Sequence, residues 1–106
     1  MNLAQEPYHQ LIQDAISILL KVKEKIKDNS DCVWTYYENS EQMKNEIDKY
    51  VHELTNGSLK LLDETYMHFL PTAAYQEHSM SNDWSPVYHK LASEFDKVYE
   101  ALKNYS

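Results

Sequence analysis

The stretch SPVYHKLASEFDKVYEAL, Ser85–Leu102, carries the clearest structural signal in the sequence. Ser85 is a typical N-cap residue, and Pro86 suits the first helical position, where its missing N–H costs nothing. Apolar side chains then recur every three or four residues, which is the spacing of one face of an α-helix. The stripe consists of Tyr88, Leu91, Ala92, Phe95, Val98, Tyr99 and Leu102. The pattern predicts an amphipathic helix with a buried face.

Two longer segments upstream show the same periodicity. We expect a first helix from about Pro7 to Lys27, because proline favours a first turn and apolar residues follow at helical spacing. A turn at residues 29–31 leads into a second helix that ends at about Thr55. A break near Asn39 is an alternative, because asparagine and serine side chains compete for backbone hydrogen bonds. Gly57 can take the left-handed conformation that ends a helix.

A third helix is expected from the Ser58 cap to Pro71, where proline ends or kinks it. Residues 72–84 form an irregular connection with a short helical piece over Thr72–His78. With one Gly and three Pro in 106 residues, the chain has few turn signals for a β-rich fold. The sequence therefore predicts one domain, residues 1–106, folded as an all-α, antiparallel up-and-down four-helix bundle with a partly helical connection between the third and fourth helices.

The charge balance restricts the class of partner. Seventeen acidic residues oppose ten basic ones, so the formal net charge is −7, and every basic residue except histidine is lysine. Nucleic-acid binders need a cationic surface and commonly use arginine, so we expect no nucleic acid as partner. An acidic field instead attracts a basic protein and speeds its encounter.

Cysteine usage and hydropathy bear on the compartment. The single Cys32 cannot form a disulfide within the chain, which fits a reducing compartment. The first residues lack the basic and apolar regions of a secretory signal. The most apolar run, Leu11–Leu20, is too short to span a bilayer. We expect a cytoplasmic protein without a membrane partner.

The first candidate binding surface lies near the start of the second helix. If that helix is continuous, Trp34 points about 140° away from the apolar stripe, and Tyr37, Glu38 and Glu41 flank it. Exposed aromatic side chains beside carboxylates are typical of the residues that dominate protein interfaces. In the alternative interpretation the helix starts later, and the segment VWTYY folds back as a lid on the core.

The second candidate surface is the connection before the last helix, because long ordered loops often carry function. We assign Tyr75, Glu77 and His78 to a partner-binding surface there. The alternative is structural, with Trp84 packed as a staple against the last helix and Tyr75 closing the end of the bundle. The sequence alone leaves both interpretations open.

Metal and catalytic sites have weak support. Of the five histidines, only His68 shares a helical face with a carboxylate, that of Glu64. We expect surface histidines and no metal or other cofactor. Cys32 has no partner pattern that would activate a thiol, and the motifs of nucleotide-binding and hydrolase folds are absent from the sequence. We therefore do not expect an enzyme.

These features favour a small acidic protein-binding module that neutralises or chaperones a basic partner. Bacterial immunity proteins and antitoxins are often of this size and charge, but that analogy concerns no specific motif. One alternative is a self-associating subunit that buries Ile16 and Leu20, which lie off the main stripe of the first helix, in a homodimer. Another is a metal-binding helical bundle.

Overall fold

The structure is a computed structural model that describes residues 5–27, 30, 32, 35, 37–71 and 73–105. Over these residues it contains five helices and no strand. The helices are α1 (Gln5–Lys25), α2 (Ser40–Thr55), α3 (Leu62–Met67), α4 (Ala74–Ser81) and α5 (Ser85–Lys103). The predicted all-α class is confirmed. None of the helices in this part of the chain is long and apolar enough to cross a membrane.

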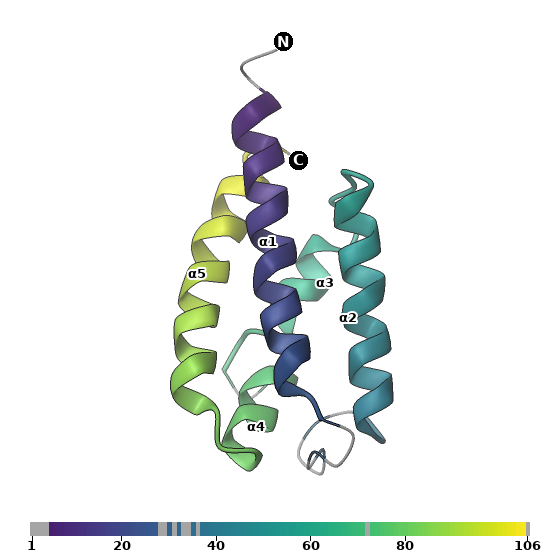
Figure 1. Ribbon diagram of the computed structural model, residues 1–106. Helices are drawn as coiled ribbons and strands as arrows, with labels where there is room; N and C mark the ends of the chain where they lie inside the picture. The colour runs from purple at the N-terminus through teal and green to yellow at the C-terminus, as the bar shows by residue number, and fades with distance from the viewer. Residues whose placement is uncertain are drawn as a thin grey trace.

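The three long helices lie side by side. Figure 1 shows α1 between α2 and α5, with α3 behind them and α4 at the end where α5 begins. The Tyr8 hydroxyl donates a hydrogen bond of 2.6 Å to the Gly57 carbonyl, and its ring centroid lies 5.1 Å from that of Tyr105. The start of α1 therefore meets the residues that follow both α2 and α5.

The four-helix arrangement is not confirmed, because the expected third helix is interrupted. Only the six residues of α3 are α-helical. The N–H groups of Leu62 and Phe69 donate to carbonyls three residues earlier, at 3.1 and 2.9 Å, so tight turns flank α3. Helical continuity through Pro71 is also excluded, because α3 ends at Met67. These turns keep Leu62 and Phe69 buried in the core.

The second helix starts later than a continuous pattern predicts. Asn39 has extended backbone angles, and its side-chain oxygen accepts a hydrogen bond of 3.0 Å from the Gln42 N–H, which makes it the N-cap of α2. The alternative with a late start is therefore confirmed at residues 37–39. The conformation predicted for Trp34 concerns a residue outside those that the structure describes.

The last helix is found where the sequence predicts it but begins one residue earlier, at Ser85, so its N-cap is Trp84 and not Ser85. The turn between α4 and α5 explains the shift. Asp83 has a φ of +63°, and the Trp84 N–H donates a hydrogen bond of 2.9 Å to the Ser79 carbonyl, which caps the end of α4. The Trp84 side chain is buried, and its ring lies 6.2 Å from that of Tyr88 at 76°, as expected for a residue that packs against the last helix.

The core forms along the stripe that the sequence predicts for α5. Tyr88, Leu91, Phe95, Val98 and Leu102 are buried, and the remaining two members of the stripe are half-buried and pack against the core. Aromatic rings stack in its centre, because the rings of Phe69 and Phe95 lie 4.4 Å apart at 13°. Burial of these side chains supplies the main driving force for folding.

Gly57 ends α2 in the left-handed conformation that the sequence predicts, with a φ of +75°. An added Cβ would meet no atom within 4 Å, so Gly57→Ala introduces only backbone strain. We expect Gly57→Ala to lower the free energy of unfolding by about 1–2 kcal/mol, measured by urea denaturation. An unchanged midpoint would show that this turn tolerates a side chain and is not a determinant of the α2 end.

Candidate functional site

The residues predicted at the start of α2 do not form one surface. Trp34 lies outside the described residues, so its contacts stay a prediction. Glu38 and Glu41 are exposed. The Tyr37 side chain is half-buried, and its hydroxyl lies 3.5 Å from His68 Nε2. Tyr37 therefore points toward a polar cluster inside the fold, while the two carboxylates point to solvent.

The residues predicted in the connection belong mainly to the core. Tyr75 is 1% exposed and His78 is 0% exposed, and only Glu77 is half-buried. The Trp84 Nε1–H donates a hydrogen bond of 2.9 Å to His78 Nδ1. In this conformation Tyr75 and His78 stabilise the junction between α4 and α5 and present no surface to a partner. The burial of this segment therefore favours its structural interpretation over a partner-binding surface.

A cluster of polar aromatic groups lies where the segment before α2, α2 itself and the α3–α4 region meet. We call it the tyrosine–histidine cluster; it consists of Tyr37, Glu46, Tyr50, His68 and Tyr75. The Tyr50 hydroxyl donates a hydrogen bond to Glu46 Oε1 and lies 2.8 Å from His68 Nε2. His68 Nε2 is also 3.4 Å from Glu46 Oε1. The cluster links α2 and the segment just before it to the α3–α4 region, which is more distant in sequence.

The hydrogen-bond pattern fixes the protonation of the cluster. Because the Tyr50 hydroxyl has one proton and gives it to Glu46, its oxygen must accept from His68, which assigns a proton to His68 Nε2. Burial by itself raises the pKa of the Glu46 carboxyl. Hydrogen bonds from Tyr50 and Tyr37 and the nearby His68 outweigh that effect and hold the pKa below its usual value. Glu46 is therefore an ionised acceptor.

Tyr75 completes the cluster from α4. Its ring lies 5.3 Å from that of His68, and among the described residues its buried hydroxyl has no hydrogen-bond partner. Burial, together with the nearby Tyr37 and Glu46, raises the Tyr75 pKa well above its usual value. The cluster thus holds neutral tyrosines around one carboxylate.

The prediction that all five histidines lie on the surface is wrong for two of them. His78 is fully buried, and the side chain of His68 is only 19% exposed. The helical pattern places His68 away from the apolar stripe, but the interrupted third helix turns it toward α2. No group of three or more His, Cys, Asp or Glu residues in the described chain could hold a metal ion. Glu64, whose carboxylate the sequence places on the same helical face as His68, has its Oε2 4.0 Å from Lys49 Nζ.

A second group of side chains forms an outer surface on α3 and α5. We call it the tyrosine–carboxylate face; it consists of Asp63, Tyr66, Asp96, Tyr99 and Glu100. The rings of Tyr66 and Tyr99 stack at 3.9 Å and 6°, and both side chains are half-buried. The Tyr99 hydroxyl donates a hydrogen bond of 2.6 Å to Asp63 Oδ1. A hydrogen bond to Asp96 raises the pKa of Tyr66 to about 12.

Lys103 occupies part of this face. Its Nζ lies 3.1 Å from Asp63 Oδ1, 3.3 Å from Asp63 Oδ2 and 5.9 Å from the centre of the Tyr99 ring. Hydrogen bonds from Tyr99 and Lys103 hold the pKa of the Asp63 carboxyl below its usual value. A carboxylate and an aromatic ring together form a favourable environment for an ammonium group. The face therefore accommodates a cation within the protein itself.

The sequence places Tyr66 and Tyr99 in apolar stripes and gives no indication of this face. Asp63 and Tyr99 are 36 residues apart, so only the packing of α3 on α5 brings them together. Aromatic residues at the edge of a stripe are the one signal that could have suggested a surface.

Comparison of the chain with protein-family models, with curated proteins and with solved structures finds no match.

Proposed function

We propose that the protein is an acidic protein-binding module that holds a basic segment of a partner on the tyrosine–carboxylate face, and so neutralises or chaperones that partner. The observation that carries this proposal is the position of the Lys103 ammonium, which contacts the Asp63 carboxylate and lies over the Tyr99 ring. A lysine or arginine of the partner would find the same two groups there. The proposal involves no catalysis and no cofactor.

Composition and charge support a basic partner. The chain carries a formal net charge of −7, and Asp63, Asp96 and Glu100 surround the stacked tyrosines with exposed carboxylates. Tyrosine is enriched among the residues that dominate binding energy at interfaces. Long-range attraction between an acidic protein and a basic partner raises the association rate and weakens with salt.

Two further features belong to this proposal. Glu38 and Glu41 are exposed and remain candidate contacts, together with Trp34, at the start of α2. We also propose that α3 and α4 together take the place of the third helix in an antiparallel up-and-down bundle. The contacts of Tyr8 with Gly57 and Tyr105 support the alignment of the long helices in such a bundle.

Self-association has weaker support than binding of a different partner. Leu20 is 43% exposed, whereas Ile16 is half-buried and packs against the core of its own chain. The second apolar stripe of α1 therefore leaves one leucine at the surface. A stable dimer interface needs a larger contiguous apolar patch.

The test is binding of a labelled lysine-rich peptide, measured by fluorescence anisotropy at low and at physiological salt. We expect wild type to bind, with affinity that falls as salt rises. Tyr99→Ala is expected to weaken binding by about 2 kcal/mol, as for an aromatic residue at the centre of an interface. Lys103→Met is expected to strengthen binding, because it removes the internal competitor for Asp63.

Asp48→Asn is the matched control for Asp63→Asn, because each substitution removes one exposed carboxylate that pairs with a lysine. We expect Asp63→Asn to weaken the complex more than Asp48→Asn. Equal affinity of wild type and Tyr99→Ala, or affinity that does not respond to salt, would contradict the proposal.

A further inference from the structure

The tyrosine–histidine cluster brings four oxygen and nitrogen atoms close together. The Tyr50 hydroxyl contacts Glu46 Oε1 and lies 2.8 Å from His68 Nε2. That nitrogen lies 3.4 Å from Glu46 Oε1 and 3.5 Å from the Tyr37 hydroxyl. We infer that the cluster is a binding site for a ferric ion, Fe³⁺, with four ligands from the chain: Tyr37, Glu46, Tyr50 and His68. This inference does not depend on the proposed function, which rests on the α3–α5 face.

The spacing of the four atoms fits a small six-coordinate ion. Ligand atoms at right angles around an ion, with bonds of about 2.0–2.1 Å, lie about 2.9 Å from one another. The separations of 2.8, 3.4 and 3.5 Å need only small side-chain adjustments to reach that value. Glu46 and Tyr50 are four residues apart in α2 and so share one face of the helix. The side chains of Glu46 and His68 are 30% and 19% exposed, which leaves the ion a path of entry.

The donor types determine the kind of ion. Glu46 and His68 are the only members of the cluster of the types that dominate zinc and calcium sites, and the other two donors are phenol oxygens. A phenolate is a hard, anionic ligand, which suits a hard and highly charged cation. Two phenolates and one carboxylate carry three negative charges. Fe³⁺ would neutralise all three, and a largely buried site favours zero net charge.

Binding of the ion requires the loss of protons. Burial, together with Glu46, raises the pKa of the Tyr37 and Tyr50 hydroxyls above the usual value, so both are neutral in the metal-free protein. Coordination would release these two protons to solvent and move the proton of His68 from Nε2 to Nδ1, which leaves a neutral imidazole ligand. A divalent ion would balance only two of the three negative charges. Glu64 also lies near Tyr50, but it pairs with Lys49 at 4.0 Å.

Tyr75 gives an independent indication that the cluster takes a ligand. Its side chain is 1% exposed, and among the described residues its buried hydroxyl has no hydrogen-bond partner. The ring lies 5.3 Å from that of His68, and the hydroxyl interacts electrostatically with Tyr37 and Glu46. Buried hydroxyls in native proteins almost always have a partner. A water bound to the ion would provide one.

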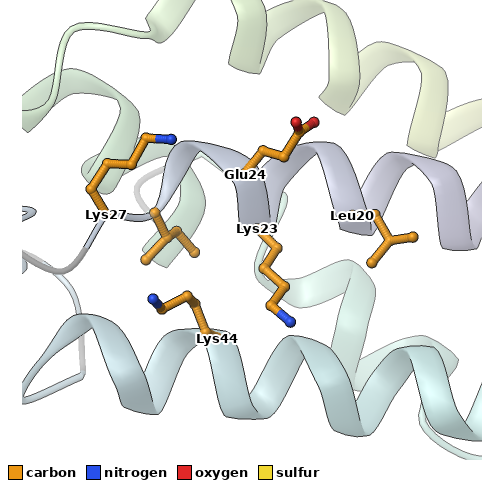
Figure 2. A pocket seen from close by; sticks show the side chains of 6 residues that line it. Leu20, Lys23, Glu24, Lys27 and Lys44 are labelled. Atoms are coloured by element: carbon orange, nitrogen blue, oxygen red, sulfur yellow. The ribbon is translucent and has the colours of Figure 1, made fainter.

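A pocket on another part of α2 does not suit a cation. It lies between the end of α1 and the first half of α2, and Figure 2 shows three lysines around it, with Glu24 as the one carboxylate of its lining. The lysines would repel Fe³⁺. Glu24→Gln is therefore a matched control for Glu46→Gln, because both remove one glutamate charge but only Glu46 belongs to the cluster.

The test adds Fe³⁺, as its nitrilotriacetate complex, to the whole protein and records visible absorption. Phenolate bound to Fe³⁺ absorbs visible light by charge transfer from the ligand to the metal, so we expect a coloured complex that saturates at one ion per chain. Glu46→Gln and Tyr37→Phe are each expected to weaken binding at least about tenfold. Glu24→Gln and Tyr8→Phe are expected to bind as wild type does. Tyr37→Phe, at a half-buried position, still tests the inference if Glu46→Gln fails to fold.

A second readout is the melting temperature. We expect Fe³⁺ and the colourless trivalent ion Ga³⁺ to raise it in wild type and not in Tyr37→Phe, because a ligand of the folded state stabilises that state. No visible band with one equivalent of Fe³⁺, or an equal band in Tyr37→Phe, would overturn the inference. Colour that keeps rising beyond one ion per chain, equally in Glu24→Gln and Glu46→Gln, would indicate an adventitious ion only. An equal rise in melting temperature with Zn²⁺ would overturn the assignment to a trivalent ion.

Discussion

Phe95→Ala is expected to lower the free energy of unfolding by about 3–5 kcal/mol. The Phe95 side chain is 0% exposed and lies in the middle of α5. Its ring stacks on Phe69 at 4.4 Å and lies 6.4 Å from Tyr66. The substitution removes the apolar surface of a whole ring and leaves a cavity between α3 and α5. A domain of this size has a small margin of stability, of about 5–15 kcal/mol, so the loss is a large fraction of it.

Urea denaturation followed by circular dichroism measures this effect. Val87→Ala is the matched control on the same helix, because Val87 is 39% exposed and its truncation is expected to cost less than about 0.5 kcal/mol. Leu91→Ala, at another buried position of the stripe, is expected to cost about 2–5 kcal/mol. Cooperative unfolding of Phe95→Ala near the wild-type midpoint would refute the assignment of the core.

The second large effect is expected in the tyrosine–histidine cluster. Tyr50→Phe removes the hydroxyl that both donates to Glu46 and accepts from His68, and the residue itself is 1% exposed. We expect a loss of about 1–3 kcal/mol in unfolding free energy, because polar groups of the two partners lose a hydrogen bond in a largely buried site. Tyr8→Phe is the control, because it removes a tyrosine hydroxyl whose hydrogen bond to Gly57 is exposed.

The cluster also gives stability a dependence on pH. The pKa of Glu46 is lowered in the folded protein, so the ionised carboxylate contributes stability above its unfolded pKa of about 4.3. That contribution is lost as pH falls through the lower, folded pKa. The difference in unfolding free energy between wild type and Glu46→Gln is therefore expected to shrink on acidification from neutral pH to below about 4. A difference that is constant over that range would contradict the assigned hydrogen bonds.

Much of the fold could be predicted because its signals are local. The stripe of α5, the glycine that ends α2 and the proline in the first turn of α5 all act within a few residues. The interruption of the third helix could not be predicted, since apolar spacing of three and four residues is also compatible with tight turns. Around α3, turns with hydrogen bonds to the third preceding residue keep Leu62 and Phe69 buried without a long helix.

The candidate sites depend on contacts between distant residues, which explains why the sequence indicates them poorly. Tyr37 and His68 are 31 residues apart, and Asp63 and Lys103 are 40 residues apart. Sequence reasoning selected Tyr37 and Tyr75 as unusual, and the structure brings both into one cluster. Tyr37 was expected at the surface from periodicity within one helix, and Tyr75 from its place in a long connection. Neither signal says which neighbour covers a side chain.

We propose that a basic partner binds on the tyrosine–carboxylate face. The most direct test of this proposal is a map of amide chemical-shift changes in the labelled protein during titration with a lysine-rich peptide. The largest changes are expected on α3 and the last two turns of α5, around Asp63, Tyr99 and Lys103. Changes centred on another surface, or none at a saturating concentration of peptide, would contradict it.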